Sequence, residues 1–220
     1  MSGPLTPEER ARETERQRER YAEEARTYDR GARLQERVMF GRGHRDWVIG
    51  RARGRTLEVA IGTGLNIPLY APDVDLVAVD LTPEMMAHAR DRAAALGRDV
   101  TFLEADAQSL PFGDDSFDTV VATYAMCSVP DLPLTIREMR RVLKPGGHLL
   151  LLDHVRSTCR PLLWLQRVRE RRRAGSAEEL TRRPLEDVEA AGLEIDESER
   201  FRAGVVERLA AVKPSLTPGP

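Results

Sequence analysis

The chain has 220 residues, of which 41% are hydrophobic and 32% are charged, and its formal net charge is -2. This length and composition predict one globular unit and exclude a strongly basic chain that binds nucleic acid through its overall field. The two cysteines, Cys127 and Cys159, lack disulfide or zinc spacing, so we expect no metal site and a cytoplasmic location. No apolar run reaches the ~18–20 residues of a membrane span, and we expect no integral membrane segment.

The N-terminal part of the chain is predicted to be helical. Thr6 and Pro7 are typical of a helix start, and the following residues are charged almost throughout. We expect this helix to project into solvent or to lie over the domain. A second helical stretch, at 34–48, is interrupted by the glycines of 41–43. We therefore divide the chain into a helical cap at 1–50, a main domain at 51–213 and a tail without fixed structure at 214–220.

An apolar strand that runs into a glycine turn comes next. Residues 57–61 are mostly apolar, and Gly62 and Gly64 permit backbone angles that are closed to other residues. A second apolar run ends at Asp80, sixteen residues after Gly64 (80 minus 64). Nucleotide-binding folds place a carboxylate on ribose hydroxyls at about this spacing. The pattern indicates a cofactor that contains a nucleoside.

Two such cofactors compete. A dinucleotide requires a third glycine near its pyrophosphate, and Ile67 stands at that place. The carboxylate of Glu58 would repel a pyrophosphate, whereas it suits a site for an ammonium group and a sulfonium. The residues favour S-adenosylmethionine. An NAD(P)-binding oxidoreductase and a catalytically silent module that binds S-adenosylmethionine remain as alternatives.

Residues 58–64, E-V-A-I-G-T-G, resemble the E-x-G-x-G-x-G motif of class I S-adenosylmethionine-dependent methyltransferases. The resemblance covers about 28–213 and is closest to the UbiE type, the bacterial phospholipid N-methyltransferases and the thiol S-methyltransferases, which share a methyltransferase type 11 domain. It implies an enzyme with a three-layer, Rossmann-like α/β fold whose seven-stranded sheet is mostly parallel with an antiparallel C-terminal strand. Ala60 replaces the first glycine of the motif. We expect this change to be mild, because that glycine mainly lets the strand lie close to its neighbours.

The rest of the chain alternates between strands and helices, as an open α/β sheet requires. Helices are expected at 69–72, 83–96, 131–143, 161–173 and 185–191, and strands at 76–80, 100–105, 119–124, 149–152, 193–199 and 204–212. The segments 110–118 and 143–147 resemble the L-P-F, S-F-D and L-K-P-G-G sequences of the same family. In such sheets, ligands bind at the carboxyl ends of the strands.

The resemblance implies how the cofactor is held. Asp80 would bind the ribose, Asp106 and Ala107 would border the adenine, and the ring of Tyr28 would reach the sulfonium. Alternatively, Tyr28 only packs its helix onto the sheet, and Asp106 only caps a turn. The full predicted set of cofactor contacts is Tyr28, Glu58, Gly62, Thr63, Gly64, Asn66, Asp80, Leu81, Met85, Asp106, Ala107 and Tyr124.

The acceptor pocket is expected where the strands at 119–124 and 149–152 end. We assign Met126, Cys127 and Trp164 to this pocket, and His154 as the candidate general base. A neutral imidazole takes a proton from a thiol, hydroxyl or ammonium group near pH 7, although a histidine after a strand also serves as a cap. The Pro-Pro-Tyr sequence of methyltransferases that act on nucleic acid bases is absent, so we expect a small-molecule acceptor and no nucleic acid.

The segment 161–173 combines leucines and Trp164 with five arginines. We favour a lid over the acceptor pocket with solvated arginines. Peripheral contact with an anionic membrane stays open as the second interpretation, because basic residues beside tryptophan and leucine are typical of interfacial helices.

Overall fold

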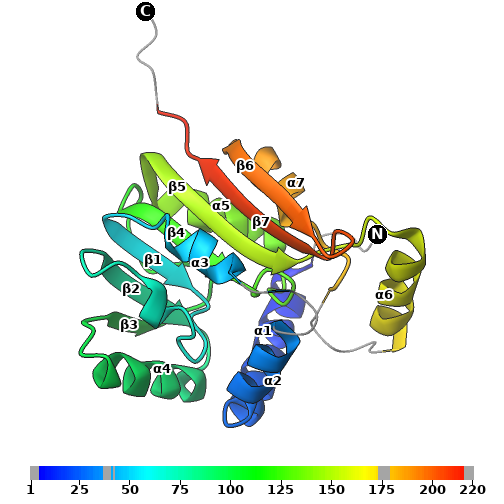
Figure 1. Cartoon of the computed structure of the whole chain (residues 1–220), viewed down its shortest axis with the longest axis horizontal. Coiled ribbons are helices and arrows are strands. Elements are labelled where there is room, and N and C mark those ends of the chain that lie inside the picture. Colours follow the sequence, from blue (N-terminus) through cyan, green and yellow to red (C-terminus); the bar gives the residue numbers. More distant parts are fainter. Residues whose placement is uncertain (1–4, 37–40, 42, 173–178, 216–220) are drawn as a thin grey trace, which may run out of the picture.

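A seven-stranded sheet with the order β3-β2-β1-β4-β5-β7-β6 lies between two layers of helices (Figure 1). The computed structural model describes residues 5–36, 41, 43–172 and 179–215. The strands are β1 (Arg55–Val59), β2 (Asp75–Asp80), β3 (Thr101–Glu104), β4 (Phe117–Thr123), β5 (Leu143–His154), β6 (Glu194–Phe201) and β7 (Val206–Val212). Strand β7 runs antiparallel to both of its neighbours, β5 and β6, whereas the other neighbouring pairs are parallel. The predicted three-layer α/β fold with an antiparallel C-terminal strand is confirmed.

The helices follow the predicted order. They are α1 (Pro7–Glu24), α2 (Tyr28–Gln35), α3 (His44–Ile49), α4 (Pro83–Ala95), α5 (Leu132–Val142), α6 (Arg160–Arg172) and α7 (Pro184–Ala190), with a 3-10 turn η2 (Ile67–Leu69). Thr6 and Glu9 form a capping box at the start of α1. Among the described helices, none combines the length and the apolar character that crossing a membrane requires.

Several boundaries differ from the sequence prediction. The turn η2 begins two residues before the predicted start of the short helix at 69–72. Strand β5 begins at Leu143 instead of residue 149. The K-P-G-G segment continues this strand because the amide of Gly146 donates to the carbonyl of Lys213 (2.7 Å) and the amide of Lys213 donates to Gly147 (3.0 Å). The interrupted helix predicted at 34–48 is α2 and α3, with 37–40 and 42 outside the described residues, as are 173–178 and most of the predicted tail.

Apolar side chains cover both faces of the sheet. On one face, residues such as Leu57 and Leu149 pack with α5 and α7. On the other face, Val121 and Leu150 pack with α3, and Ala78 packs with α4. This double burial explains why β1, β2, β4 and β5 read as nearly continuous apolar runs.

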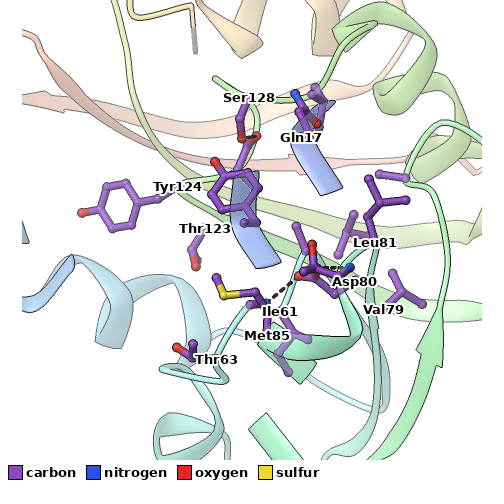
Figure 2. Close-up of a pocket in the computed structure, with 18 of the residues that line it drawn as sticks. Gln17, Ile61, Thr63, Val79, Asp80, Leu81, Met85, Thr123, Tyr124 and Ser128 are labelled. Atoms are coloured by element: carbon purple, nitrogen blue, oxygen red, sulfur yellow. Dashed lines mark hydrogen bonds between the residues drawn. The ribbon is translucent and has the colours of Figure 1, made fainter. Parts of the chain in front are cut away.

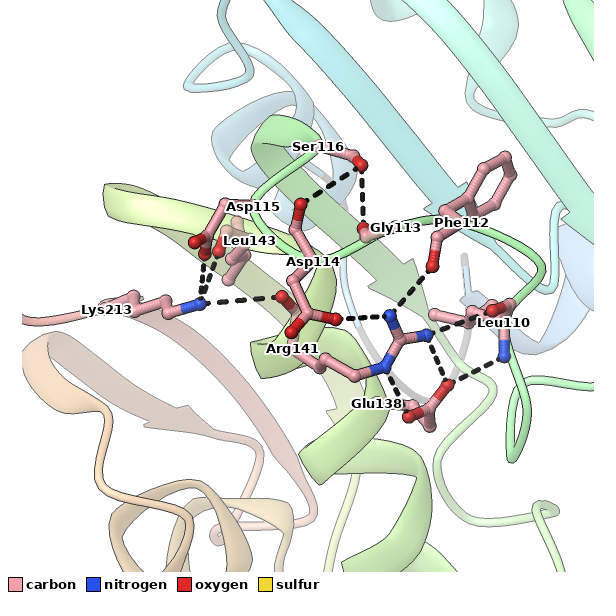
Figure 3. A network of polar contacts seen from close by, with 10 residues as sticks. All are labelled: Leu110, Phe112, Gly113, Asp114, Asp115, Ser116, Glu138, Arg141, Leu143 and Lys213. Carbon is pink, nitrogen blue, oxygen red and sulfur yellow. Dashed lines mark hydrogen bonds and ion pairs between the residues drawn. The ribbon is translucent and has the colours of Figure 1, made fainter.

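A polar network fixes the amino-terminal ends of β4 and β5 (Figure 3). The Arg141 guanidinium donates to the carbonyls of Leu110 (3.0 Å) and Phe112 (2.7 Å) and pairs with Glu138 (2.7 Å). Lys213 donates to the carbonyl of Leu143 at 2.6 Å. The network ties α5 to the loop before β4, and it thereby holds these two strands at the ends opposite to Thr123 and His154.

Candidate functional site

A cavity opens at the carboxyl ends of β1 to β4 (Figure 2). Most of the predicted cofactor residues line it: Tyr28, Gly62, Thr63, Asp80, Leu81, Met85, Asp106, Ala107 and Tyr124. The strand ends therefore bring these residues together as an open α/β sheet predicts.

Gly62 and Asp80 form one wall of this cavity. The φ angle of Gly62 is 57°, in the left-handed region that favours glycine. The carboxylate of Asp80 accepts hydrogen bonds from the amides of Gly62 (2.7 Å) and Thr82 (2.9 Å), and its side chain still reaches the cavity. Burial raises the pKa of Asp80 above its usual value, although these hydrogen bonds oppose the shift. The glycine turn and the end of β2 are thus locked together through one carboxylate.

Helix α1 supplies a wall that the sequence did not predict. Thr14, Gln17 and Tyr21 line the cavity, although the helix is charged over most of its surface. Two contacts hold α1 across the strand ends: Gln108 Nε2 donates to Thr14 at 3.1 Å, and Arg10 pairs with Asp131 at 3.1 Å. Of the two sequence-based alternatives for this helix, the structure therefore supports the one in which it lies over the domain.

Gln17 presents a buried donor to the cavity. Its side chain is 7% exposed, and its Nε2 has no hydrogen-bond partner among the described residues. A buried donor without a partner costs about 1–3 kcal/mol, which a ligand acceptor would recover. This orphaned group is evidence from the chain itself that the cavity is shaped for a polar ligand.

Tyr28 is fixed at the cavity by its neighbour in sequence. Asp29 accepts hydrogen bonds from Thr63 and from Arg92, each at 2.5 Å, which ties α2 to the glycine turn and to α4. Burial opposes ionisation of Asp29, but these two partners outweigh it and lower its pKa. Burial raises the pKa of Tyr28 to about 12, so its hydroxyl stays protonated. Asp29 thus positions the Tyr28 ring.

A second cavity adjoins the first. The two share the lining residues Tyr21, Tyr28, Arg45 and Tyr124. The second cavity lies between α2, α6 and the ends of β4 and β5, and Cys127 and His154 line it as predicted for the acceptor pocket. Because the cavities meet at shared aromatic side chains, molecules bound in the two would lie next to each other.

Cys127, Asp153 and His154 form a cluster in which one polar atom from each lies within 4.8 Å of the others. Asp153 accepts hydrogen bonds from the amides of Met126 (2.6 Å) and His154 (2.8 Å), and the Cys127 thiol also donates to it. Burial raises the pKa of Asp153, against the effect of these partners and of His154. Such a residue set can coordinate a metal, but the hydrogen bonds already made to both oxygens of Asp153 favour a hydrogen-bonded cluster.

Arg45 lies between the two cavities and was not identified from the sequence. Its guanidinium donates to Asn66 (2.7 Å) and Thr123 (2.8 Å) and pairs with Glu36. Its central carbon lies 5.0 Å from the centre of the Tyr124 ring. Burial opposes the charge on Arg45, but its hydrogen bonds to Glu36 and the charge of that carboxylate raise its pKa. No local motif marks this arginine, because its partners come from distant parts of the chain.

Glu58 and Asn66 lie behind the cavity wall, contrary to the predicted direct cofactor contact. Asn66 Nδ2 donates to Glu58 at 2.7 Å, and the Tyr70 hydroxyl donates to it at 2.9 Å. Both Glu58 and Asn66 are 1% exposed. Burial raises the pKa of Glu58 to about 7, although both hydrogen bonds oppose the shift. These residues position Arg45 and Thr123 instead of contacting a ligand in the cavity.

Three other predicted site residues do not line either cavity. A Cβ at Gly64 would lie 2.6 Å from Ile67 Cδ1 and 3.0 Å from Ala89 Cβ, so this glycine serves the packing of α4. Met126 is 0% exposed and belongs to the core beneath the pocket. Trp164 is 66% exposed and lies outside the pocket, because its helix turns other residues inward.

Ala60 also differs from the sequence-based expectation. Its φ angle is 56°, in the left-handed region where a Cβ is unfavourable. The position therefore favours glycine for its backbone angle as well as for close packing, and alanine there is a strained choice rather than a mild one.

Comparison with known proteins finds relatives of the segment that supplies most of the lining of the first cavity. Residues 57–151 match the family described as "Methyltransferase domain". The chain is 39% identical over 103 residues to a phosphatidylethanolamine N-methyltransferase of Cereibacter sphaeroides, which covers 46% of this chain and 51% of that protein. It is 40% identical over 111 residues to a demethylmenaquinone methyltransferase of Thermus thermophilus, covering 49% of this chain and 50% of that protein. The chain thus matches about half the length of these relatives.

The fold extends beyond the matched segment. The crystal structure of the [4+2]-cyclase SpnF resembles this chain with a TM-score of 0.63 and 25% identity, covering 78% of this chain and 80% of that one. A protein named for a different reaction therefore shares this architecture, and the reaction has to be argued from the site.

Proposed function

We propose that this chain, whose residues 57–151 match the family described as "Methyltransferase domain", transfers a methyl group from S-adenosylmethionine to a small molecule. The observation that carries the proposal is the junction of the two cavities at Tyr28, Arg45 and Tyr124. The first cavity would hold the cofactor, and the second would hold a thiol, hydroxyl, amine or lipid head group.

The first cavity suits S-adenosylmethionine in the chemistry of its walls. Asp80 would accept from ribose hydroxyls, Asp106 would accept from the adenine amino group, and the orphaned Gln17 donor would bond to an acceptor atom of the adenosine. When bound, the cofactor supplies the methyl group on a positively charged sulfonium. The ring faces of Tyr28 and Tyr124 at the junction are groups that attract such a cation.

His154 would act as the general base in the second cavity. Its Nδ1 lies 3.4 Å from the carboxylate of Asp153. A carboxylate on one ring nitrogen favours the tautomer with the proton at that nitrogen, which leaves Nε2 to accept a proton. The Asp153 carboxylate would also stabilise the charged imidazole that results. His154 would then remove a proton from the acceptor while the cavity walls hold the nucleophile toward the junction.

The second cavity favours an acceptor with an apolar body. Leu162 and Leu165 line it from α6, Val205 from the loop before β7, and Tyr21 from α1. Phosphatidylethanolamine and demethylmenaquinone, which appear in the names of the two relatives, combine a reactive group with such a body.

The direct test is the release of S-adenosylhomocysteine over a panel of thiols, phenols, amines and phospholipids, which also identifies the acceptor. We expect release above background with at least one class. If no class gives release while S-adenosylmethionine binds, the result contradicts methyl transfer and supports the alternative of a catalytically silent binding module.

With an active acceptor, His154→Ala should lower the turnover and remove the fall in rate at acidic pH, because protonated imidazole cannot act as a base. His88→Ala is the matched control, since His88 is an exposed histidine on α4. Equal rates for wild type and His154→Ala at every pH would show that the proton is removed elsewhere.

A further inference from the structure

Helix α6 turns polar side chains toward the protein. The Gln166 side chain accepts from the amide of Ser157 (2.8 Å) and donates to the carbonyl of Val155 (3.0 Å). Glu170, one turn later, accepts from the amide of Thr181 at 2.7 Å. Residues four apart share one face of a helix, so this polar face is the one that attaches α6 to the domain.

The opposite face of α6 carries apolar side chains in solvent. Trp164 is 66% exposed and Leu165 is 53% exposed. Val168, one turn after Trp164, is half-buried on the same side. In Figure 1, α6 stands apart from the sheet at the edge of the molecule. The helix thus presents to solvent the kind of surface that helices of a globular domain normally turn toward the core.

Arginines border this outer face. Arg160, Arg167, Arg169 and Arg171 are all exposed. At about 100° per residue, Arg160, Arg167 and Arg171 fall on one side of Trp164, and Arg169 falls beside Leu165. The one acidic residue within α6, Glu170, is engaged with Thr181 on the inner face. The outer face is therefore an apolar strip with positive charge on both sides.

We propose that the outer face of α6 docks onto an anionic lipid bilayer, with Trp164 and Leu165 at the level of the head groups and the arginines on the lipid phosphates. This combination of aromatic, aliphatic and basic residues is what an interfacial helix uses. With 13 residues, α6 is too short to span a bilayer and lies along its surface instead.

The position of α6 links this surface to the second cavity. Leu165 and Arg169 stand at the border between the outer face and the cavity, which they line together with Leu162. Gly31 and Ala32 line the cavity from α2. Docking would bring the cavity next to the bilayer, where a lipophilic acceptor dissolves. The docking itself does not depend on methyl transfer, so it can fail or hold independently of the proposed activity.

The fluorescence of Trp164 can be used to measure the docking of α6. The chain has two tryptophans, and the Trp47→Phe variant leaves Trp164 as the only one. We expect the Trp164 emission to shift to shorter wavelength with vesicles of phosphatidylcholine and phosphatidylglycerol, and much less with phosphatidylcholine alone. Added salt should weaken binding to the anionic vesicles, because it screens the arginines.

Two pairs of variants separate the apolar and the charged contributions in a vesicle sedimentation assay. The Trp164→Ser/Leu165→Ser variant should bind anionic vesicles with an affinity at least about tenfold lower than that of the wild type, because it removes the apolar area that docking buries. Its control is Leu96→Ser, an exposed leucine at the end of α4 (51%). Arg167→Glu/Arg171→Glu should likewise reduce binding, whereas Arg137→Glu on α5 should not. Circular dichroism checks that each variant is folded.

Three results would overturn the proposal. The first is that wild-type protein does not bind anionic vesicles. The second is that the Trp164→Ser/Leu165→Ser variant binds them with the affinity of the wild type. The third is a wild-type dimer, seen by analytical ultracentrifugation, that the same double variant converts to a monomer. That outcome would assign the outer face of α6 to a second copy of the chain.

Discussion

Of the five described residues other than glycine that have a positive φ angle, two lie at the edge of the first cavity. Ala60 has a φ angle of 56° and Tyr124 has one of 53°, and each follows a strand of the parallel sheet. For residues other than glycine, this region costs about 1–2 kcal/mol. Such strain is found preferentially at functional sites, where the surrounding structure holds the residue in place. At Tyr124 it directs the ring to the junction of both cavities.

Ala60→Gly should therefore stabilise the protein by about 1 kcal/mol, because relief of the left-handed strain outweighs the extra freedom of glycine in the unfolded chain. Urea unfolding measures the change. As a control, Ala78→Gly in β2 should destabilise, since Ala78 is fully buried within an extended strand. A loss of stability in Ala60→Gly would show that the Cβ of Ala60 contributes more in packing than its backbone angle costs.

Glu58 gives the fold a pH dependence of defined sign. Burial raises its pKa from 4.5 to about 7, so the folded state holds the proton more tightly than the unfolded state does. The corresponding stabilisation is fully present below pH 4.5 and is lost as the pH rises through 7. The shift corresponds to an order of magnitude of about 3 kcal/mol.

The Glu58→Gln variant should lack this contribution. We expect wild type to lose stability relative to Glu58→Gln as the pH is raised from about 4.5 to about 7, followed by denaturant unfolding at each pH. The Tyr70 hydroxyl can turn to accept from the glutamine amide, so the variant is expected to fold. A difference between the two proteins that does not change with pH would contradict the assignment of the shift to Glu58.

Short-range sequence patterns predicted part of the site. Gly62 and Asp80 follow directly from a strand, a glycine turn and the end of the next strand, and both line the cavity. Glu58 and Asn66 belong to the same motif but turn inward, because the amide of Asn66 is used by the carboxylate of Glu58. Arg45 could not be predicted, since its environment depends on tertiary packing.

At the scale of elements, the contribution of α1 to the site could not be predicted from the composition of the helix. Its apolar residues are few, and Gln17 is its only buried residue. The helix is held in place by polar contacts with the loops after β3 and β4, which no periodicity in the sequence reveals. Likewise, Trp164 is outside the pocket because hydrogen bonds of Gln166 and Glu170 set the rotation of α6.

Gln17→Leu tests whether α1 recognises the cofactor. The substitution removes a buried donor that lacks a partner among the described residues, so it should raise the stability of the ligand-free protein by about 1 kcal/mol. The same change should weaken the binding of S-adenosylmethionine. Thermal unfolding and titration calorimetry measure the two effects, and unchanged affinity would contradict a role of Gln17 in binding.

The Arg141 network should contribute to stability without serving the site directly. Arg141→Met removes the donors to Leu110 and Phe112 and leaves Glu138 without its cation. We expect a loss of about 1–3 kcal/mol in the free energy of unfolding, because the carbonyl of Phe112 loses its donor and the Leu110 carbonyl keeps only the amide of Phe112. Loss of S-adenosylmethionine affinity in the folded variant, at a temperature where it is fully native, would contradict this purely structural role.

At the scale of the whole molecule, the sequence predicted the architecture well. Strands and helices alternate along the chain with few glycine turns, and this alternation leaves few possible orders for the strands of a parallel sheet. It predicted the surface less well. The same helix α6 that lines the second cavity exposes Trp164 to solvent. Of the two sequence-based interpretations of this segment, pocket lid and membrane contact, the second stays a proposal.

The central claim is that the cavity at the ends of β1 to β4 binds S-adenosylmethionine through Asp80. Titration calorimetry with S-adenosylmethionine and with NAD tests it most directly, using wild type, Asp80→Asn, and Asp75→Asn as the matched control at the exposed start of the same strand. The account predicts binding of S-adenosylmethionine alone, weakened by about 1–3 kcal/mol in Asp80→Asn and unchanged in Asp75→Asn. Binding of NAD without S-adenosylmethionine, or equal affinity in Asp80→Asn and wild type, would contradict it.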